Sequence, residues 1–258
     1  MSEHVLPVLM YHGLHAGPHS HGVFDAVYSV EPRAFAQQLD WLVEAGYRSV
    51  RLRDAEQARI TSRCVVITFD DGDVSNREIA LPLLVARGMT AEFFVTADFI
   101  GRPGYMSRED VHALAAAGMG VQSHGLSHRY LAELPAGELE NELRRSRQQL
   151  ETISGERVEA LALPGGRGGE RERHMALRLG YRDVLNSVPG CNRRFARGRY
   201  LQRLAITREL ALQDFARLVQ WRGVLPRARQ LRYHALAWMK HALGNRRYEQ
   251  LRRRVLER

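Results

Sequence analysis

Cysteine is scarce in this chain, and long apolar runs are missing from it. Only two cysteines, Cys64 and Cys191, occur among 258 residues, and they form no CxxC motif. Two thiols in a chain of this size indicate free, reduced cysteines and not a framework of structural disulfides. No apolar run approaches the roughly 20 residues that a membrane-spanning helix needs. The composition, 45% hydrophobic and 26% charged, predicts a globular protein of one large domain or two small ones.

The first residues lack the basic cluster of a secretory signal. The stretch MSEHVLPVLMYHG has an acid at Glu3, no early Lys or Arg, and Pro7 inside a short apolar run. Such a pattern does not fit a cleaved leader. We therefore expect a cytoplasmic protein, provided that the sequence is full length.

Basic charge is concentrated at the C-terminus. Residues 222–258 contain eleven Lys or Arg and two acids, which accounts for the whole net charge of +9. The remaining residues carry 27 basic and 27 acidic side chains, so they are neutral. A neutral body gives no electrostatic reason to expect nucleic-acid binding.

Short apolar, β-rich runs alternate with helical patterns. Continuous apolar strands between helices indicate a parallel sheet covered by helices, and seven or eight such strands favour an α/β barrel over an open sheet. The expected strands are Val5–Tyr11, Tyr47–Leu52, Cys64–Phe69, Thr90–Thr96, Gly120–Ser123, Ala160–Leu163, Tyr181–Asn186 and one near Leu201–Thr207. The expected helices are Pro32–Ala45, Asn76–Ala86, Ser107–Ala117, Leu134–Ile153 and Glu170–Leu179.

Two adjacent carboxylates, Asp70 and Asp71, directly follow the apolar run VVITF, and Gly72 and Asp73 come next. Neighbouring carboxylates repel each other and need a partner charge, although Asp-Gly is also a common turn dipeptide. In a parallel barrel the C-terminal strand ends share the face that carries the site. We interpret Asp73 as an exposed turn acid or a helix-start charge.

The stretch SHGLSHRYL places His124 and His128 four residues apart after another predicted strand. Two imidazoles and one carboxylate can hold a divalent ion and leave positions open for water and substrate, as catalytic metal sites do. His15 and His19 have the same spacing within GLHAGPHSHG. That stretch has no apolar framing, so we interpret it as a solvated loop.

Taken in order, these motifs resemble the polysaccharide deacetylase (NodB-homology) family, the family-four carbohydrate esterases. TFDDG followed by SHGLSH is similar to the first two motifs of the family. VLMYHG, TAEFFVT, LPGG and LQRLAI resemble counterparts in its exopolysaccharide-type branch, over roughly residues 5 to 210. The resemblance implies a distorted (β/α) barrel and metal-dependent removal of an N-acetyl group from an amino sugar.

The resemblance also implies roles for the acids and histidines. Asp71, His124 and His128 match the metal-binding triad, and Asp70 matches the catalytic base that takes a proton from the metal-bound water. The expected cofactor is one divalent ion. Zn²⁺ is the default for a His₂Asp set, and Co²⁺, Ni²⁺ or Mn²⁺ suits these ligands too.

The LPGG motif and the general acid complete the implied site. A backbone N–H in LPGG, best that of Gly165, matches the donor to the oxyanion, and Pro164 would fix the turn. An ordinary Pro-Gly turn is the alternative. Many relatives have a histidine as general acid in a motif near the last barrel strand, where this chain has YLQRLAITREL and no histidine, and Ala162 stands where they often have an arginine. His12 in MYHG matches the acid proposed for the exopolysaccharide-type branch; a core histidine is the alternative.

Two arginines and one asparagine are weaker candidates. Arg167 in GGRGG and Arg203 in QRL would orient substrate or a catalytic acid, or else lie on the surface. Asn192 in PGCNRR carries a weaker signal still.

The C-terminal segment divides the chain into a catalytic barrel, residues 1–222, and a basic helical tail, residues 223–258. Within it, apolar residues recur at helical spacing at Ala228, Leu231, Ala235, Trp238 and Ala242. A basic amphipathic helix can rest on an anionic membrane, here at the inner face. The alternative is a helix packed on the barrel with solvated arginines.

The sequence therefore predicts a metal-dependent amidohydrolase acting on an N-acylated amino sugar in a polysaccharide or lipid-linked glycan. The alternative is a non-catalytic barrel that binds glycan or assists exopolysaccharide assembly. Loss of a metal ligand or of the base would favour that alternative, and the sequence retains them all. Nucleic-acid binding through the tail is the weakest interpretation.

Overall fold

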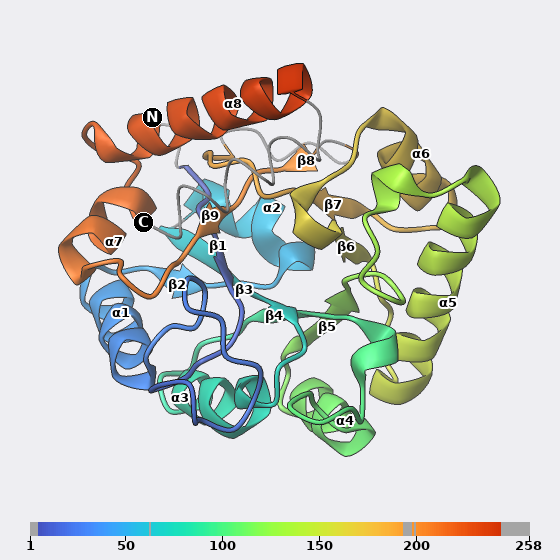
Figure 1. The fold of residues 1–258 in the computed structure, drawn as a ribbon. Coiled ribbons are helices and arrows are strands. Elements are labelled where there is room, and N and C mark those ends of the chain that lie inside the picture. Colours follow the sequence, from blue (N-terminus) through green and yellow to red (C-terminus); the bar gives the residue numbers. More distant parts are fainter. Residues whose placement is uncertain (1–4, 62, 193–197, 199, 244–258) are drawn as a thin grey trace.

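Parallel strands curve around a common centre in the computed structural model, which describes residues 5–61, 63–192, 198 and 200–243 (Figure 1). The strand order is β8-β7-β6-β5-β4-β3-β1-β9, and every neighbouring pair is parallel. The strands are β1 (Val8–Tyr11), β3 (Cys64–Asp71), β4 (Glu92–Val95), β5 (Gly120–Ser123), β6 (Ala160–Ala162), β7 (Asp183–Leu185), β8 (Tyr200–Leu201) and β9 (Leu204–Ala205). The predicted α/β barrel-like fold is confirmed.

The two ends of this sheet come from one short segment. β8 pairs with β7 and β9 pairs with β1, and only Gln202 and Arg203 separate β8 from β9. One interrupted strand thus meets both edges of the curved sheet. The interruption turns Arg203 inward, where its side chain is fully buried.

Helices cover the outside of the sheet (Figure 1). The α-helices are α1 (Pro32–Glu44), α2 (Leu52–Thr61), α3 (Leu81–Val85), α4 (Arg108–Ala116), α5 (Ala136–Ser154), α6 (Glu170–Arg178), α7 (Leu212–Val219) and α8 (Leu225–Leu243). A π-helix (Asn76–Ala80) precedes α3, and 3₁₀ turns occur at Ala97–Phe99, Leu131–Glu133 and Pro164–Gly166. The core lies between the helices and the sheet and includes stacked Phe69 and Phe93.

The start of α4 shows how a local sequence signal fixes a helix end, because Ser107 and Asp110 form a capping box. Ser107 Oγ accepts a hydrogen bond from Asp110 N at 3.1 Å, and Ser107 N donates to Asp110 Oδ2 at 2.9 Å. These bonds satisfy backbone donors that would otherwise lack partners in the first turn of α4.

Three expectations about the elements were wrong. The strand expected at Tyr47–Leu52 is reduced to β2 (Arg48–Ser49), which pairs with β3 outside the main order. The chain enters α2 directly afterwards, and neither α2 nor α7 was expected. The helix expected at Asn76–Ala86 begins as a π-helix and becomes α-helical only at Leu81. Packing against the sheet, not local periodicity, decides these boundaries.

The basic tail contributes α8, which packs beside α7 and lies across one end of the barrel (Figure 1). It does not use the apolar stripe that the sequence suggested. Ala228, Leu231 and Ala235 are exposed, Leu231 by 71%, whereas Pro226 is buried and Arg229 and Tyr233 are half-buried. Residues 244–258 lie outside the described part of the chain.

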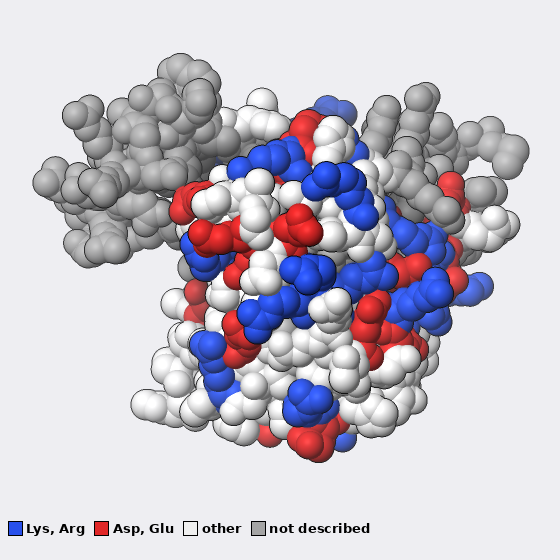
Figure 2. Space-filling view, turned by 90° about the vertical axis from the view of Figure 1, so that its right-hand side faces the viewer, with Lys and Arg blue, Asp and Glu red and all other residues white. Residues whose placement is uncertain are grey.

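Surface charge is mixed on the face that Figure 2 shows. Basic and acidic side chains alternate over it, without a continuous basic area. Within the described residues, no helix has both the length and the apolar character that crossing a bilayer requires.

Candidate active site

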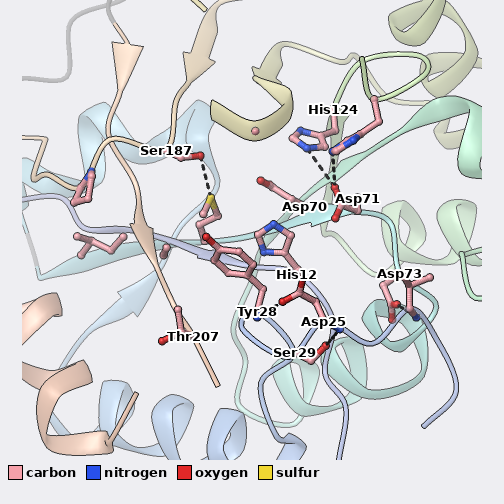
Figure 3. A pocket seen from close by; sticks show the side chains of 18 of the residues that line it. His12, Asp25, Tyr28, Ser29, Asp70, Asp71, Asp73, His124, Ser187 and Thr207 are labelled. Carbon is pink, nitrogen blue, oxygen red and sulfur yellow. Dashed lines mark hydrogen bonds and ion pairs between the residues drawn. The ribbon is translucent and has the colours of Figure 1, made fainter. Parts of the chain in front are cut away.

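Strand β3 delivers two carboxylates to the C-terminal end of the sheet. Its residues from Cys64 to Asp70 are buried, and only Asp71 at its end is half-exposed. Asp70 pairs in register with Phe94 of β4 and is 2% exposed. Asp71 has φ = 75°, a left-handed conformation that asparagine and aspartate tolerate better than most residues. The kink there separates the directions of the two neighbouring carboxylates (Figure 3).

Asp71 contacts both imidazoles of the HxxxH motif, and Figure 3 shows its carboxylate facing His124. Asp71 Oδ1 is 3.3 Å from His124 Nε2 and 3.2 Å from His128 Nε2. The connection between the histidines is a tight loop, in which Gly125 and His128 both have positive φ. One ligand atom from each of these three residues lies within 4.8 Å of the others. The convergence expected from the sequence is therefore present.

The separations suit a tetrahedral metal ion. Ligand atoms about 2.0–2.1 Å from zinc at tetrahedral angles lie roughly 3.3 Å apart. The two Asp71–imidazole separations are 3.3 and 3.2 Å. Among the described residues, the buried Asp71 Oδ1 has no hydrogen-bond partner. A buried carboxylate oxygen rarely lacks a partner, and a divalent ion would supply one.

A backbone contact orients His124 toward this point. His124 Nδ1 lies 3.0 Å from the carbonyl oxygen of Ala162, an acceptor that requires the proton on Nδ1. Nε2 is then the deprotonated nitrogen and faces Asp71. Ligating histidines commonly have such a partner on the second nitrogen.

The charges around the site shift the pKa values of Asp71 and His124 in opposite directions. Burial opposes ionisation of Asp71, but the adjacent His124 and His128 outweigh it and hold the pKa of Asp71 well below its ordinary value. Burial disfavours charge on His124, but Asp70 and Asp71 outweigh it and raise the pKa of His124. A bound cation would take the place of that proton.

Asp70 is held by a buried arginine. Arg203 Nη1 and Nη2 donate to Asp70 Oδ1 and Oδ2 at 2.7 and 2.8 Å, and Arg203 Nε donates to the Asn186 carbonyl at 2.9 Å. Burial alone would raise the pKa of Asp70, but attraction to Arg203 and His124 outweighs burial and lowers it. Asp70 is therefore an ionised carboxylate in a fixed orientation. It is close enough to His12 for that imidazole to lower its pKa as well.

Loss of Arg203 should destabilise the protein strongly. Arg203→Met would leave a buried carboxylate without its cation, which typically costs about 3–5 kcal/mol of unfolding free energy. Urea unfolding at pH 7 measures this. The control Arg217→Met removes a half-exposed pair with Asp214 on α7 and should cost under about 1 kcal/mol.

The pH dependence of that deficit follows from Asp70. The pKa of Asp70 is lowered in the native protein. The ionised carboxylate therefore adds to the free energy of unfolding above its unfolded pKa, and this stabilisation is lost as the pH falls through its folded pKa. The difference between Arg203→Met and the parent should therefore shrink in acid. A deficit independent of pH would contradict this assignment.

His12 follows β1 and lies on the same side as the carboxylates (Figure 3). Its ring stacks on Tyr28 with centroids 4.7 Å apart, and its carbonyl accepts a hydrogen bond from Asn76 Nδ2 at 2.8 Å. Among the described residues, buried His12 Nδ1 has no hydrogen-bond partner. The contact with Tyr28 and the backbone bond to Asn76 therefore position the ring, and no hydrogen bond to Nδ1 does.

The LPGG turn places Gly165, but not its neighbours, in the pocket. Gly165 has φ = 61°, and a Cβ there would approach Tyr130 Cε1 to 2.7 Å, so only glycine fits. Pro164 is buried and begins the turn. The Arg167 guanidinium lies over the Tyr130 ring at 3.9 Å.

The three residues expected to contact substrate lie next to the pocket wall residues but do not line the pocket itself. They are Pro164, Arg167 and Arg203. Arg203 is fully buried, which excludes a surface role and leaves the alternative of orienting Asp70. Asn192 is also buried; its side chain bonds the backbone of Leu6 and Gln202.

Two interpretations of the N-terminal half were wrong. Asp73 is not an exposed turn acid: it is buried and accepts hydrogen bonds from Val23 N at 2.6 Å and Ser75 N at 2.8 Å. His15 is fully buried between Ser29 and Asp73, whereas His19 is exposed as expected. Together these contacts anchor the loop before α1, which carries Tyr28 to the site.

A pocket of about 590 Å³ opens over these groups. This is within the range of small-molecule sites. His12, Asp70, Asp71, His124, His128 and Gly165 all line it. Sequence reasoning missed the aromatic wall of Phe24, Tyr28 and Tyr105, and also Arg229, Arg232 and Tyr233 of α8. The aromatic spacing in GVFDAVYSV was the only local signal for that wall.

Comparisons with known proteins agree with the fold and the motifs. Residues 58–184 match the family described as polysaccharide deacetylase. YxkH of Bacillus subtilis (strain 168), itself only provisionally assigned as a polysaccharide deacetylase, is 27% identical over 190 residues. The matched region is 72% of this chain and 65% of that relative, so the chain spans less than two thirds of it.

Solved structures share the architecture. IcaB from Ammonifex degensii superposes with a TM-score of 0.71 at 25% identity, covering 84% of this chain and 97% of that one. The Streptococcus pyogenes deacetylase PplD, solved in complex with acetate, gives a TM-score of 0.74 at 22% identity, with 84% and 99% coverage. At 22% identity, the similarity to PplD shows a shared fold and nothing about activity.

Proposed function

The chain carries a domain of the polysaccharide deacetylase family, and on that premise we propose that it is a metal-dependent N-deacetylase of amino sugars. The substrate would be an N-acetylated amino sugar in a polysaccharide or lipid-linked glycan. One observation carries the proposal. Asp71, His124 and His128 converge in an open pocket, and a second, ionised carboxylate lies directly beside them.

Different residues of the site would carry out different steps of amide hydrolysis. A divalent ion held by Asp71, His124 and His128, most simply Zn²⁺, would supply an acidified water and polarise the amide carbonyl. Asp70 is the general base. Its carboxylate is fixed by Arg203 and kept ionised, so it can take a proton from the attacking water. The backbone N–H of Gly165 would donate to the oxyanion that forms on the carbonyl oxygen.

His12 is the proposed general acid for the leaving amine. It lines the pocket, stacks on Tyr28 and has a buried Nδ1 without a hydrogen-bond partner among the described residues. Amine expulsion needs a proton, whereas an activated ester leaves without one. His12→Gln should therefore slow amide hydrolysis much more than hydrolysis of a nitrophenyl acetate. Equal losses on both would remove His12 from this role.

Acetate release tests the function directly. Metal-loaded protein should release acetate from N-acetylglucosamine oligomers, and a chelator should abolish release until Zn²⁺ or Co²⁺ is returned. Formate should be measured in parallel on N-formyl sugars, because the pocket does not select the acyl group by itself. No acyl release from any amino sugar, with metal bound, would favour a non-catalytic glycan-binding protein.

We further propose that α8 contacts an anionic membrane, as on the inner face of the cytoplasmic membrane. Val224 and Leu231 are 80% and 71% exposed on or beside a helix in a strongly basic segment. The full-length protein should float with anionic vesicles, and Leu231→Glu should reduce flotation several-fold. Val85→Glu, at an exposed position on α3, is the matched control. Equal flotation of both variants and the parent would reject membrane contact.

A further inference from the structure

The pocket lining carries charges of both signs. β3 provides Asp70 and Asp71, beside which the metal would bind. α8 adds Arg229, Arg232 and Tyr233 to the lining of the same pocket. No role in deacetylation described above uses these three residues. They come from the C-terminal segment, outside the matched residues 58–184.

Arg229 is held at the pocket by the barrel itself. Its Nη1 donates to the carbonyl oxygen of Ala205, at the end of β9, at 3.1 Å. The side chain is half-buried, and burial lowers the pKa of Arg229; the nearby Asp214 opposes this shift, and Arg232 adds to it. A guanidinium carries five N–H donors, so most of those on Arg229 remain for another partner.

No carboxylate oxygen lies within 4.0 Å of Arg229 or Arg232 in the described part of the chain, whereas Arg203 and Arg208 each have one. Asp214 is close enough to act on the charge of Arg229, but its carboxylate is paired with Arg217 at 2.9 Å. Asp25 also lines the pocket, but its Oδ1 accepts the backbone N–H groups of Val27 and Tyr28. Arg229 is half-buried and the neighbouring Arg232 is exposed, and two like charges side by side are unfavourable unless an anion joins them.

From this arrangement we infer that Arg229 and Arg232 bind the phosphate of a phosphate-linked amino sugar, whose N-acyl group reaches the metal site. The inference rests on the proposed deacetylase function and narrows its substrate. Two guanidiniums match the charge and the bidentate geometry of a phosphate ester. An internal unit of a neutral polymer offers no group for them.

Paired substrates test this in the full-length, metal-loaded enzyme. N-acetylglucosamine 1-phosphate is compared with the neutral methyl N-acetylglucosaminide, for the parent and for Arg229→Gln and Arg232→Gln. Each variant should raise KM for the phosphate about ten- to a hundredfold, the usual effect of losing a charged hydrogen bond, with kcat and the neutral substrate little changed. Arg227→Gln, exposed on α8 and outside the pocket lining, should match the parent.

Calorimetry with inorganic pyrophosphate gives a readout that needs no turnover. Binding should weaken at least tenfold in Arg229→Gln and stay unchanged in Arg227→Gln. If all variants bound pyrophosphate alike, the phosphate site would be rejected even in an active enzyme. If no substrate released an acyl group but pyrophosphate binding followed the predicted pattern, only the deacetylase proposal would fail.

Further substrate arms separate the sources of the phosphate. UDP-N-acetylglucosamine and a short polyprenyl diphosphate N-acetylglucosamine in detergent micelles carry the same group on different carriers. The substrate with the higher kcat/KM in the parent identifies the carrier, provided that its kcat/KM falls in Arg229→Gln. A preference that persists unchanged in Arg229→Gln would place recognition elsewhere and overturn the inference.

Discussion

Asp70→Asn should reduce kcat/KM for amide hydrolysis by about 10²–10⁴-fold while leaving the metal content unchanged. The amide cannot accept a proton, but it is nearly isosteric with the carboxylate and is not one of the three ligands. Initial rates of acetate release, with metal analysis of the same sample, measure both effects together. The control Asp54→Asn changes an exposed acid at the start of α2 and should have no effect.

The folded state of the Asp70 variant needs its own measurement. Arg203 would retain one acceptor and lose its counter-charge, so unfolding in urea should occur at a lower concentration. If the folded variant still binds metal, its lower activity comes from the missing general base and not from unfolding. If Asp70→Asn lost its metal at ligand concentrations that saturate the parent, Asp70 would be a ligand, and the division of roles between the two acids would be wrong.

Asp71→Ala or His124→Ala should weaken metal binding more than the ten- to hundredfold typical of residues that only orient ligands. Each change removes one of three converging donors, and Asp71 is the one that faces both imidazoles. Activity should fall to the level of chelated parent enzyme. Calorimetric titration with Zn²⁺ measures the affinity.

A surface histidine provides the control for these ligand variants. His174 is exposed on α6, where it contacts Glu170 and Arg173 and no residue of the metal site, so His174→Ala should bind metal like the parent. A high zinc concentration should partly restore His124→Ala, because two ligands remain. Unchanged zinc affinity in Asp71→Ala would show that the ion binds elsewhere or not at all.

The site was predictable where it depended on strand ends. Asp71 precedes His124 and His128 by more than fifty residues, but the acid and the histidine pair lie at the ends of two strands of one parallel sheet, and such ends meet at one edge. The motif spacing and the family resemblance assigned chemistry to that edge. Neither depended on details of packing.

The rest of the site depends on contacts that no local pattern encodes. Arg203 reaches Asp70 because the last strand is interrupted between β8 and β9, and a strand expected as one run gives no sign of that break. Asp73 and His15 are buried because a loop folds over them, although their sequence reads as polar turn. Hydropathy also did not indicate which face of α8 meets the barrel: Leu231 of the apolar stripe is exposed, and Tyr233 lines the pocket.

Anomalous diffraction from zinc-soaked crystals is the most direct test of the metal centre. The account predicts one strong peak about 2.0–2.2 Å from an Asp71 carboxylate oxygen and from Nε2 of His124 and His128, with Asp70 outside the coordination sphere. No peak at saturating zinc, or a peak coordinated by Asp70 or by His15 in place of this triad, would contradict it.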